Sequence, residues 1–375
     1  MQLNKYSYAF NLHSFMLHLQ NITIYQFKNY LQQNFHFNKN VIGIYGNNGM
    51  GKTNLLDAIY FLCFTKSYFS KTDSNIVHTG LQGMRLEGNF TRNGENENIV
   101  CIIRENNRKE MHHNGEEYKR FSAHIGRLPA VMIAPDDVEL ITGTSEIRRK
   151  YIDTLLSQLD HRYLQTLIDY NKVLQQRNSL LKAAAERGYI DDALLDILNA
   201  QLVKPAKYIF NCRKSFLHNY LPAVAKNYRQ IAGTDEPLVL EYYSQLLEDD
   251  FEKLLVTFRQ KDLMLQRTTT GIHKDDIELK LHDENFKNIA SQGQRKSLLF
   301  ALKLKEFEAL KSAKGFAPVL LLDDVFEKLD AARMQNLLHH VCVQNNSQVF
   351  ITDTHKERLQ QALENLKMPF QLIGL

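Results

Sequence analysis

Hydrophobic and polar positions change their periodicity twice along this chain. From residue 17 to about residue 134, apolar and polar residues mostly alternate, which is typical of strands. From about 146 to 266, leucines recur at helical spacing, which predicts helices, and Gly188 and Pro222 predict helix ends. From about residue 268 onward, strand-like and helix-like segments alternate again. We therefore expect an α/β domain into which a helical block is inserted.

Three short apolar runs predict the central strands of one sheet. Residues 41–45 and 349–351 are mostly apolar, and residues 319–322 (V-L-L-L) are entirely so, as in parallel strands buried on both faces. The fold expected is α/β, with a mixed central sheet and its helices, an antiparallel β subdomain and an inserted helical lobe. The expected boundaries are 1–140 for the first part of the α/β lobe with the β subdomain, 141–266 for the helical lobe, and 267–375 for the second part of the α/β lobe.

Composition narrows the class of protein without identifying a partner. The chain has 46 Lys and Arg against 42 Asp and Glu, a net charge of +4, so any nucleic-acid site must come from local clusters. The four cysteines form no C-x-x-C pair, which makes a zinc site or a disulfide framework unexpected. No apolar run approaches the roughly 20 residues of a membrane span, and the first fifteen residues lack signal-peptide features. We expect a cytoplasmic protein with no membrane partner.

The strongest chemical signal is a phosphate loop, G-N-N-G-M-G-K-T, at residues 46–53. An apolar strand precedes it and a helix-like run follows it, which favours a functional loop over a chance glycine-rich turn. Its backbone N–H groups and the helix N-terminus suit phosphate oxygens, Lys52 suits the β and γ phosphates of ATP, and Thr53 suits Mg²⁺. The predicted nucleotide-binding residues here are Gly46, Asn47, Asn48, Gly49, Met50, Gly51, Lys52, Thr53 and Asn54.

The apolar run at 319–322 ends in Asp323 and Asp324, which has the form of a Walker B strand. Ligands in open α/β sheets bind at the carboxyl ends of the strands, so both carboxylates are expected beside the phosphate loop. We predict that Asp323 holds Mg²⁺, through water, and that Asp324 orients or deprotonates the attacking water. The alternative is an ordinary buried strand that ends in an acidic turn.

Ser291 begins the sequence S-Q-G-Q-R, about thirty residues before the acidic pair and at the start of a predicted helix. Ser291 can cap that helix, whose free N–H groups make an anion site. With the phosphate loop upstream, the segment resembles the signature motif of ABC-type ATPases. Asp330 is placed like the D-loop aspartate of that superfamily, and His355 like its switch histidine. The alternatives are a plain capped helix and an exposed histidine.

The resemblance to ABC-type ATPases implies an ATP-dependent homodimer in which each signature closes over the partner's nucleotide. Ser291, Gly293 and Asp330 would then complete the nucleotide site. Where many relatives carry Glu, this chain has Asp324, whose shorter side chain predicts slow turnover. The residues predicted to act in catalysis are Lys52, Asp324, Ser291, Gln294 and His355.

Several segments together resemble one family, the RecF DNA replication and repair proteins. They lie at residues 25–30, 49–60, 135–137, 148–153, 176–182, 271–276 and 322–330. Residues 176–182, Q-R-N-S-L-L-K, are the most specific of them. The chain departs from the family pattern at Ile272, where proline is usual, and at Gln266, where glycine is common.

This resemblance implies a cytoplasmic, weak, DNA-stimulated ATPase that uses ATP and Mg²⁺. Proteins of the family dimerise on ATP and bind single- and double-stranded DNA at gaps or junctions. With RecO and RecR they help to load RecA, in recombinational repair and the SOS response.

The sequence itself offers candidate DNA-phosphate contacts and equally ordinary alternatives for them. The candidates are Arg92, Arg104, Arg108, Lys109, His112, His113, Arg148, Arg149 and Lys150. Each could instead lie on a solvated face, and the last three could brace the helical lobe or approach the nucleotide.

Two other classes of ATPase are alternatives to this family. The nucleotide-binding subunit of an ABC transporter would be shorter, with an L-S-G-G-Q signature. A chromosome-structuring ATPase would need hundreds of heptad residues between its halves, and they are absent.

Overall fold

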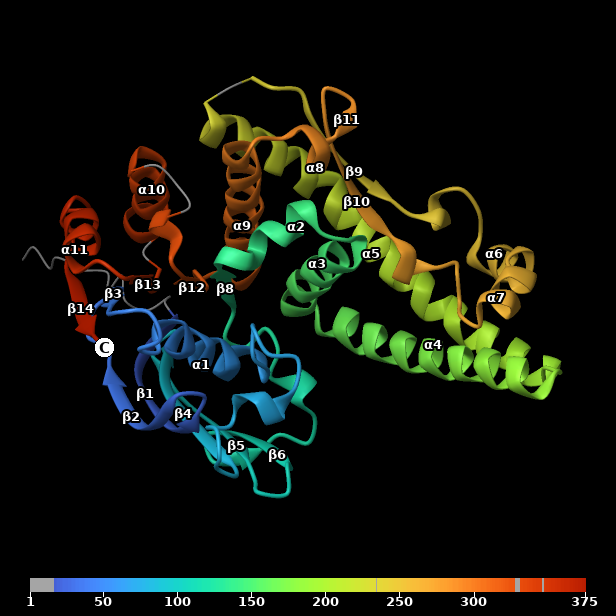
Figure 1. Ribbon diagram of the computed structural model, residues 1–375, viewed down its shortest axis with the longest axis horizontal. Coiled ribbons are helices and arrows are strands. Elements are labelled where there is room, and N and C mark those ends of the chain that lie inside the picture. Colours follow the sequence, from blue (N-terminus) through green and yellow to red (C-terminus); the bar gives the residue numbers. More distant parts are fainter. Residues whose placement is uncertain (1–16, 234, 328–330, 346) are drawn as a thin grey trace, which may run out of the picture.

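The computed structural model describes residues 17–233, 235–327, 331–345 and 347–375 (Figure 1). Its central sheet has five strands in the order β14-β3-β13-β12-β8. Every pairing among these strands is parallel. The three predicted apolar runs form three of the five strands. Their bounds are Phe370–Gly374, Val41–Tyr45, Val349–Asp353, Val319–Leu322 and Ala130–Ile133, in sheet order.

A second sheet is antiparallel and carries the strand order β2-β1-β4-β5-β6-β7. Its strands are β1 (Leu17–Phe27), β2 (Tyr30–His36), β4 (Met84–Arg92), β5 (Glu95–Ile103), β6 (Lys109–His113) and β7 (Glu116–Glu117). The expected mixture of strand directions thus comes from separate sheets, one parallel and the others antiparallel.

The inserted helices form an arm that extends away from the two sheets, toward the right of Figure 1. It consists of α3 (Ser145–Leu159), α4 (His161–Arg187) and α5 (Asp192–Ala232). Gly188 ends α4 with a left-handed φ of 76°, as predicted. The prediction for Pro222 was wrong, because α5 runs through it and through Pro205. A proline inside a helix removes one N–H bond and crowds the carbonyl four residues earlier, but the buried side chains that follow both prolines keep α5 packed along its length.

The periodicity predicts helices up to residue 266, but residues 235–266 also contain a strand. β9 (Leu238–Tyr243) pairs antiparallel with β10 (Asp276–Leu281), and β11 (Glu284–Asn285) completes this third sheet. Two short helices, α6 (Phe251–Thr257) and α7 (Arg259–Leu265), follow β9 and lie near the far end of α4 (Figure 1). Gln266 ends α7 with a left-handed φ of 54°, which explains why glycine suits that position.

The parallel sheet separates two hydrophobic clusters. Alternate residues of β12 face opposite sides, with Leu320 and Leu322 in one cluster and Val319 and Leu321 in the other. The first cluster includes α9 (Gln292–Lys314), α11 (Lys356–Glu364) and the helical arm. The second includes α1 (Lys52–Phe64) and the antiparallel sheet. The remaining helices are α2 (Glu139–Thr142), α8 (Phe286–Ile289) and α10 (Ala331–Leu338).

Candidate functional site

The phosphate loop lies between β3 and α1, as the sequence predicts. Gly51 is the N-cap of α1 and has a φ of 110°. A Cβ atom there would lie 2.8 Å from Asn29 Nδ2 and 2.9 Å from the Tyr30 hydroxyl. Both the dihedral angle and the space therefore require glycine at this position.

Lys52 is buried beneath the loop, and its ammonium group is held by loop carbonyls. Lys52 Nζ donates to Gly46 O at 2.8 Å and to Asn47 O at 3.2 Å. The loop residues 47–50 are exposed above it. The ammonium is thus already positioned in the loop, where phosphate oxygens are its natural acceptors.

Asn29 and Tyr30, beside and in the antiparallel sheet, form hydrogen bonds with the phosphate loop and the start of α1. The sequence did not single out either residue for the site. Asn29 donates from Nδ2 to Gly49 O at 3.4 Å, and its Oδ1 accepts from Asn54 Nδ2 at 2.7 Å. The Tyr30 hydroxyl donates to Gly51 O at 3.1 Å. The only signal for them was their place in the family-like segment at residues 25–30.

Thr53 and the first Walker B aspartate meet, although they are 270 residues apart. Thr53 Oγ1 lies 3.0 Å from both carboxylate oxygens of Asp323. Thr352, at the end of the neighbouring strand β13, donates from Oγ1 to Asp323 Oδ1 at 2.8 Å. Thr352 was missed, although a hydroxyl at the end of an apolar strand was its signal. These oxygens suit a hard cation such as Mg²⁺ once a ligand adds its phosphates.

Among the described residues there is no group of three or more His, Cys, Asp or Glu that could hold a metal ion by itself. Mg²⁺ is usually bound through one or two carboxylates together with substrate phosphates and water. The predicted ligands Thr53 and Asp323 fit such a site.

Asp323 should make the stability of the chain depend on pH. Burial raises the pKa of the Asp323 carboxyl to about 6, and the hydrogen bonds from Thr352 and Thr53 oppose that rise. Because the unfolded pKa is about 3.9, folding favours the protonated form. The contribution of Asp323 to stability is therefore greatest below about pH 4 and falls, by about 3 kcal/mol in all, as the pH rises through about 6.

Denaturant unfolding of the wild type and of Asp323→Asn between pH 4 and 7 measures this contribution. The asparagine does not titrate, so the wild type should lose stability relative to the variant across that window. Parallel profiles for the two proteins would contradict the inferred pKa.

Asp324 follows Asp323 at the carboxyl end of β12, as expected for the second acidic residue. Its φ is 45°, in the left-handed region, and its backbone N–H donates to Thr352 Oγ1 at 2.9 Å. A non-glycine residue in this region is held at some conformational cost by the surrounding structure. The same threonine hydroxyl therefore fixes both Walker B residues.

The signature segment forms a capping box at the start of α9. Ser291 Oγ accepts from Gln294 N at 3.2 Å, while Gln294 Oε1 accepts from Ser291 N at 2.7 Å. Gln294 Nε2 also donates to Glu236 Oε1 at 2.9 Å, so its side chain is held within its own chain. Ser291 and Gly293 are exposed, and they remain available to a partner molecule.

The start of α9 and the Walker B strand share a pocket of about 300 Å³. Gln292 and Arg295 line it on the side of α9, and Asp323 lines it on the side of β12. The signature helix therefore begins near the predicted metal ligand, which local sequence patterns could not establish.

The structure says less about the roles of the two remaining predicted residues, His355 and Asp330. His355 is exposed after β13, and its backbone N–H donates to Asp353 Oδ1 at 2.8 Å. Its catalytic role stays a prediction. Asp330, the predicted D-loop residue, lies outside the described residues.

Most candidate DNA-phosphate contacts already face carboxylates. The pairs on the antiparallel sheet are Arg92–Glu97, Arg104–Glu110, Arg108–Glu110, Arg108–Glu117, Lys109–Asp73, His112–Glu110 and His113–Glu97. Arg148 pairs with Asp276 at 2.6 Å, which is the bracing role that the sequence left open. Lys150 differs, since it forms no ion pair with any described residue.

Buried ion pairs join two of the family-like segments to neighbouring parts of the chain. Arg177 lies 2.7 Å from Asp262, and both side chains are fully buried. Arg213 on α5 lies 2.7 Å from Asp275. Residues 176–182 and 271–276 therefore contribute to the packing of the helical arm rather than to the phosphate loop.

None of the helices in the described ranges is both long and apolar enough to cross a bilayer.

Relatives of this chain were found by sequence. The profile of the RecF/RecN/SMC N-terminal domain matches residues 18–372. The chain is 39% identical to the DNA replication and repair protein RecF of Flavobacterium johnsoniae, over 96% of this chain and 100% of that protein. It is also 39% identical to RecF of Parabacteroides distasonis, over 92% of this chain and 93% of that one.

Solved structures with a similar fold were found as well. The recombination mediator protein RecF with ATP, of the RecFOR pathway, superimposes with a TM-score of 0.85 at 29% identity, over 92% of this chain and 94% of that one. An Smc head domain with an extended coiled coil, from Pyrococcus furiosus, gives a TM-score of 0.52 at 17% identity, over 92% of each chain. The second likeness concerns the fold alone.

Proposed function

The chain belongs to the RecF family of DNA replication and repair proteins, which have an ABC-type, SMC-like ATPase head, and from that premise we propose that it is an ATP-dependent DNA-binding protein of recombinational repair. Family membership removes the transporter hypothesis. The contact between Thr53 and Asp323 carries the proposal, because it joins the phosphate loop to the Walker B strand in one site.

ATP and Mg²⁺ are the ligands that this site fits. Lys52 would bind the β and γ phosphates, and Thr53 and Asp323 would hold the metal ion. When bound, Mg²⁺ would neutralise charge on the phosphate oxygens. Asp324 would orient the attacking water and accept its proton.

ATP-driven dimerisation supplies the rest of the mechanism. The exposed Ser291 and the N-terminus of α9 would approach the γ-phosphate bound to the partner chain. Because this contact exists only in the dimer with ATP, nucleotide binding would stabilise the dimer, and hydrolysis would release it. Gln294 would release its hydrogen bond to Glu236 and form one with the nucleotide bound to the partner chain instead.

The proposed substrate is DNA with a gap or a junction between single and double strands. The RecF protein whose ATP-bound structure resembles this chain is a recombination mediator of the RecFOR pathway. We propose RecO and RecR as partners in the cytoplasm, the loading of RecA as the outcome, and the SOS response as the setting.

Turnover by the wild-type chain should be slow. Asp324 has a shorter side chain than glutamate, so it should hold the attacking water less well. We expect a kcat well below the common value of about 10 s⁻¹, with stimulation by DNA. A coupled phosphate-release assay with and without gapped duplex measures both, and a kcat above that value would contradict the proposed role of Asp324.

Sedimentation of the full chain tests the proposed function. It should be measured alone, with Mg²⁺ and a non-hydrolysable ATP analogue, with gapped duplex, and with both ligands. We expect a dimer with the analogue, and a complex with DNA that is tighter when the analogue is present. A monomer that ignores all of these ligands would overturn the proposal.

A further inference from the structure

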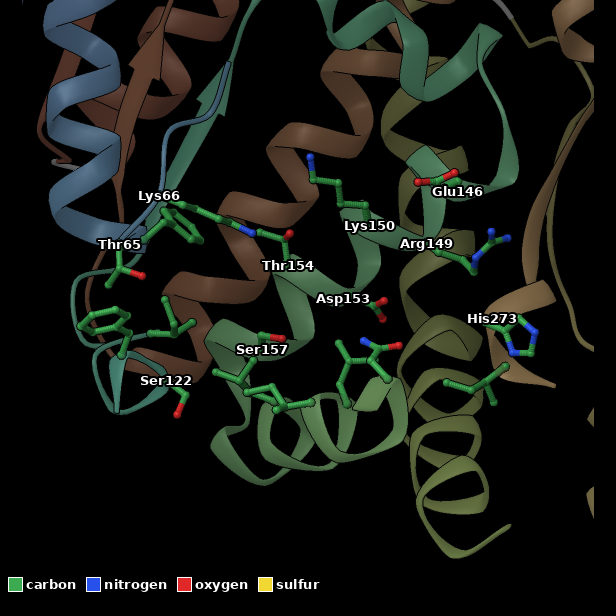
Figure 2. A pocket seen from close by; sticks show the side chains of 18 of the residues that line it. Thr65, Lys66, Ser122, Glu146, Arg149, Lys150, Asp153, Thr154, Ser157 and His273 are labelled. Atoms are coloured by element: carbon green, nitrogen blue, oxygen red, sulfur yellow. The ribbon is translucent and has the colours of Figure 1, made fainter. Parts of the chain in front are cut away.

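A cavity of about 590 Å³ lies between the two lobes, away from the phosphate loop (Figure 2). One wall is Thr65 and Lys66, directly after α1, and the opposite wall is α3. Because α1 has 13 residues, the cavity lies roughly 20 Å from the phosphate loop at the other end of that helix. It is therefore a second site, distinct from the nucleotide site.

Cationic side chains outnumber carboxylates around this cavity. The cations are Lys66, Arg149, Lys150 and Arg213, and the carboxylates are Glu146 and Asp153, which leaves a net charge of +2. His273 adds no charge, because burial lowers its pKa to about 4 and the ring is neutral at neutral pH.

Asp153 does not neutralise Arg149 or the two lysines that line the cavity. Asp153 forms an ion pair with Arg213 at 2.8 Å, and the Arg213 guanidinium also pairs with Asp275. Arg149 donates to the backbone oxygen of Asp275 at 2.6 Å and forms no ion pair with any described carboxylate. The positive charge is therefore left on Arg149 and on the two lysines.

Lys66 and Lys150 come from different lobes and repel each other. Both are exposed, and neither forms an ion pair within the described ranges. Desolvation and the charge of Lys150 lower the pKa of Lys66. In Figure 2, Lys66 reaches toward Thr154, which lies one helical turn from Lys150 on α3. An anion between the lobes would relieve this repulsion and find a hydroxyl beside it.

We propose that this cavity binds a backbone phosphate of DNA, held by Lys66 from one lobe and by Arg149 and Lys150 from the other. The inference rests on the proposed function and adds the place where DNA touches the chain. An open cavity between lobes suits one phosphate of a long polyanion, because the rest of the strand can continue along the surface. The phosphate would also join α1, which carries the phosphate loop, to the helical arm.

The test compares Lys66→Ala/Lys150→Ala with a control, Lys182→Ala/Lys207→Ala, that removes the same charge from exposed lysines of α4 and α5. Binding of a fluorescent gapped duplex is measured by anisotropy over a range of salt, with the ATP analogue at saturation. The cavity variant should bind about 10- to 100-fold more weakly, and its log–log salt slope should fall by about 1. The control should match the wild type.

A third variant has the opposite expected sign. Glu146→Gln removes an exposed carboxylate of the cavity, so it should tighten DNA binding by about two- to fivefold. A gain in affinity cannot arise from misfolding. Lys66→Arg/Lys150→Arg keeps both charges and should retain most of the affinity.

A cavity variant that binds gapped duplex like the wild type would overturn the inference. If that variant also loses calorimetric binding of inorganic pyrophosphate, the cavity takes a free phosphorylated ligand instead of DNA. Failure of the proposed function is distinct, because the wild type itself would then bind no DNA.

Discussion

Replacing Lys52 by alanine should lower ATP turnover by about 100- to 1000-fold, the loss typical when one donor to a developing charge is removed. Lys52 is the buried cation of the phosphate loop, and its ammonium already points at the loop carbonyls of Gly46 and Asn47. Without it, nothing else in the loop can follow the negative charge as the γ-phosphate departs. A phosphate-release assay on purified wild type and variant measures the change.

Lys182→Ala is the control for Lys52→Ala, because it removes an exposed lysine of α4 far from the loop. Thermal melting should show that both variants are folded. Turnover at the wild-type rate in Lys52→Ala would mean that the loop has been misassigned or that another ATPase contaminates the preparation.

Replacing Ser291 by aspartate should weaken the ATP-driven dimer by about 100-fold or more, since a carboxylate would face the partner's γ-phosphate. Aspartate is as good an N-cap as serine, so α9 should keep its start and the monomer its stability. Nucleotide binding by the monomer should not change. Sedimentation equilibrium with the ATP analogue measures the dimer, and a nucleotide-binding assay on dilute protein provides the control.

Two further substitutions separate capping from dimer formation. Ser291→Ala removes the cap and should cost about 1 kcal/mol of stability, with a smaller effect on the dimer. Gln294→Ala should weaken the dimer while sparing nucleotide binding by the monomer. If Ser291→Asp dimerises like the wild type, then the capping box is structural and the composite site is not formed here.

The sequence predicts best those parts of the site that are local in the chain. The phosphate loop, the apolar strand before Asp323 and the cap at Ser291 each depend on a few neighbouring residues, and all three are present in the structure. Contacts between separate segments of the chain carry no such signal, even at a separation of 20 residues, as between Asn29 and Gly49. The hydrogen bonds of Asn29 and Tyr30 with the phosphate loop were therefore not predicted.

Charge was the least predictable property. A basic residue in the sequence gives no sign of its partner, and Arg92 and Arg104 turned out to face Glu97 and Glu110 from the same sheet. The sequence did not predict Lys66 as a phosphate contact, because only the folded chain brings it to the same cavity as Lys150 of the other lobe. Pro222 shows the same limit for helices, since burial of its neighbours outweighs its local effect.

The parallel sheet, with a separate hydrophobic cluster on each face, makes this head modular. The cluster behind α1 supports the nucleotide pocket without help from the outer part of the helical arm, whose side chains pack on the other face. An arm can therefore grow, shrink or be rebuilt over evolutionary time while the pocket keeps its shape. The Smc head that shares this fold carries an extended coiled coil, whereas here a compact hairpin of α4 and α5 suffices.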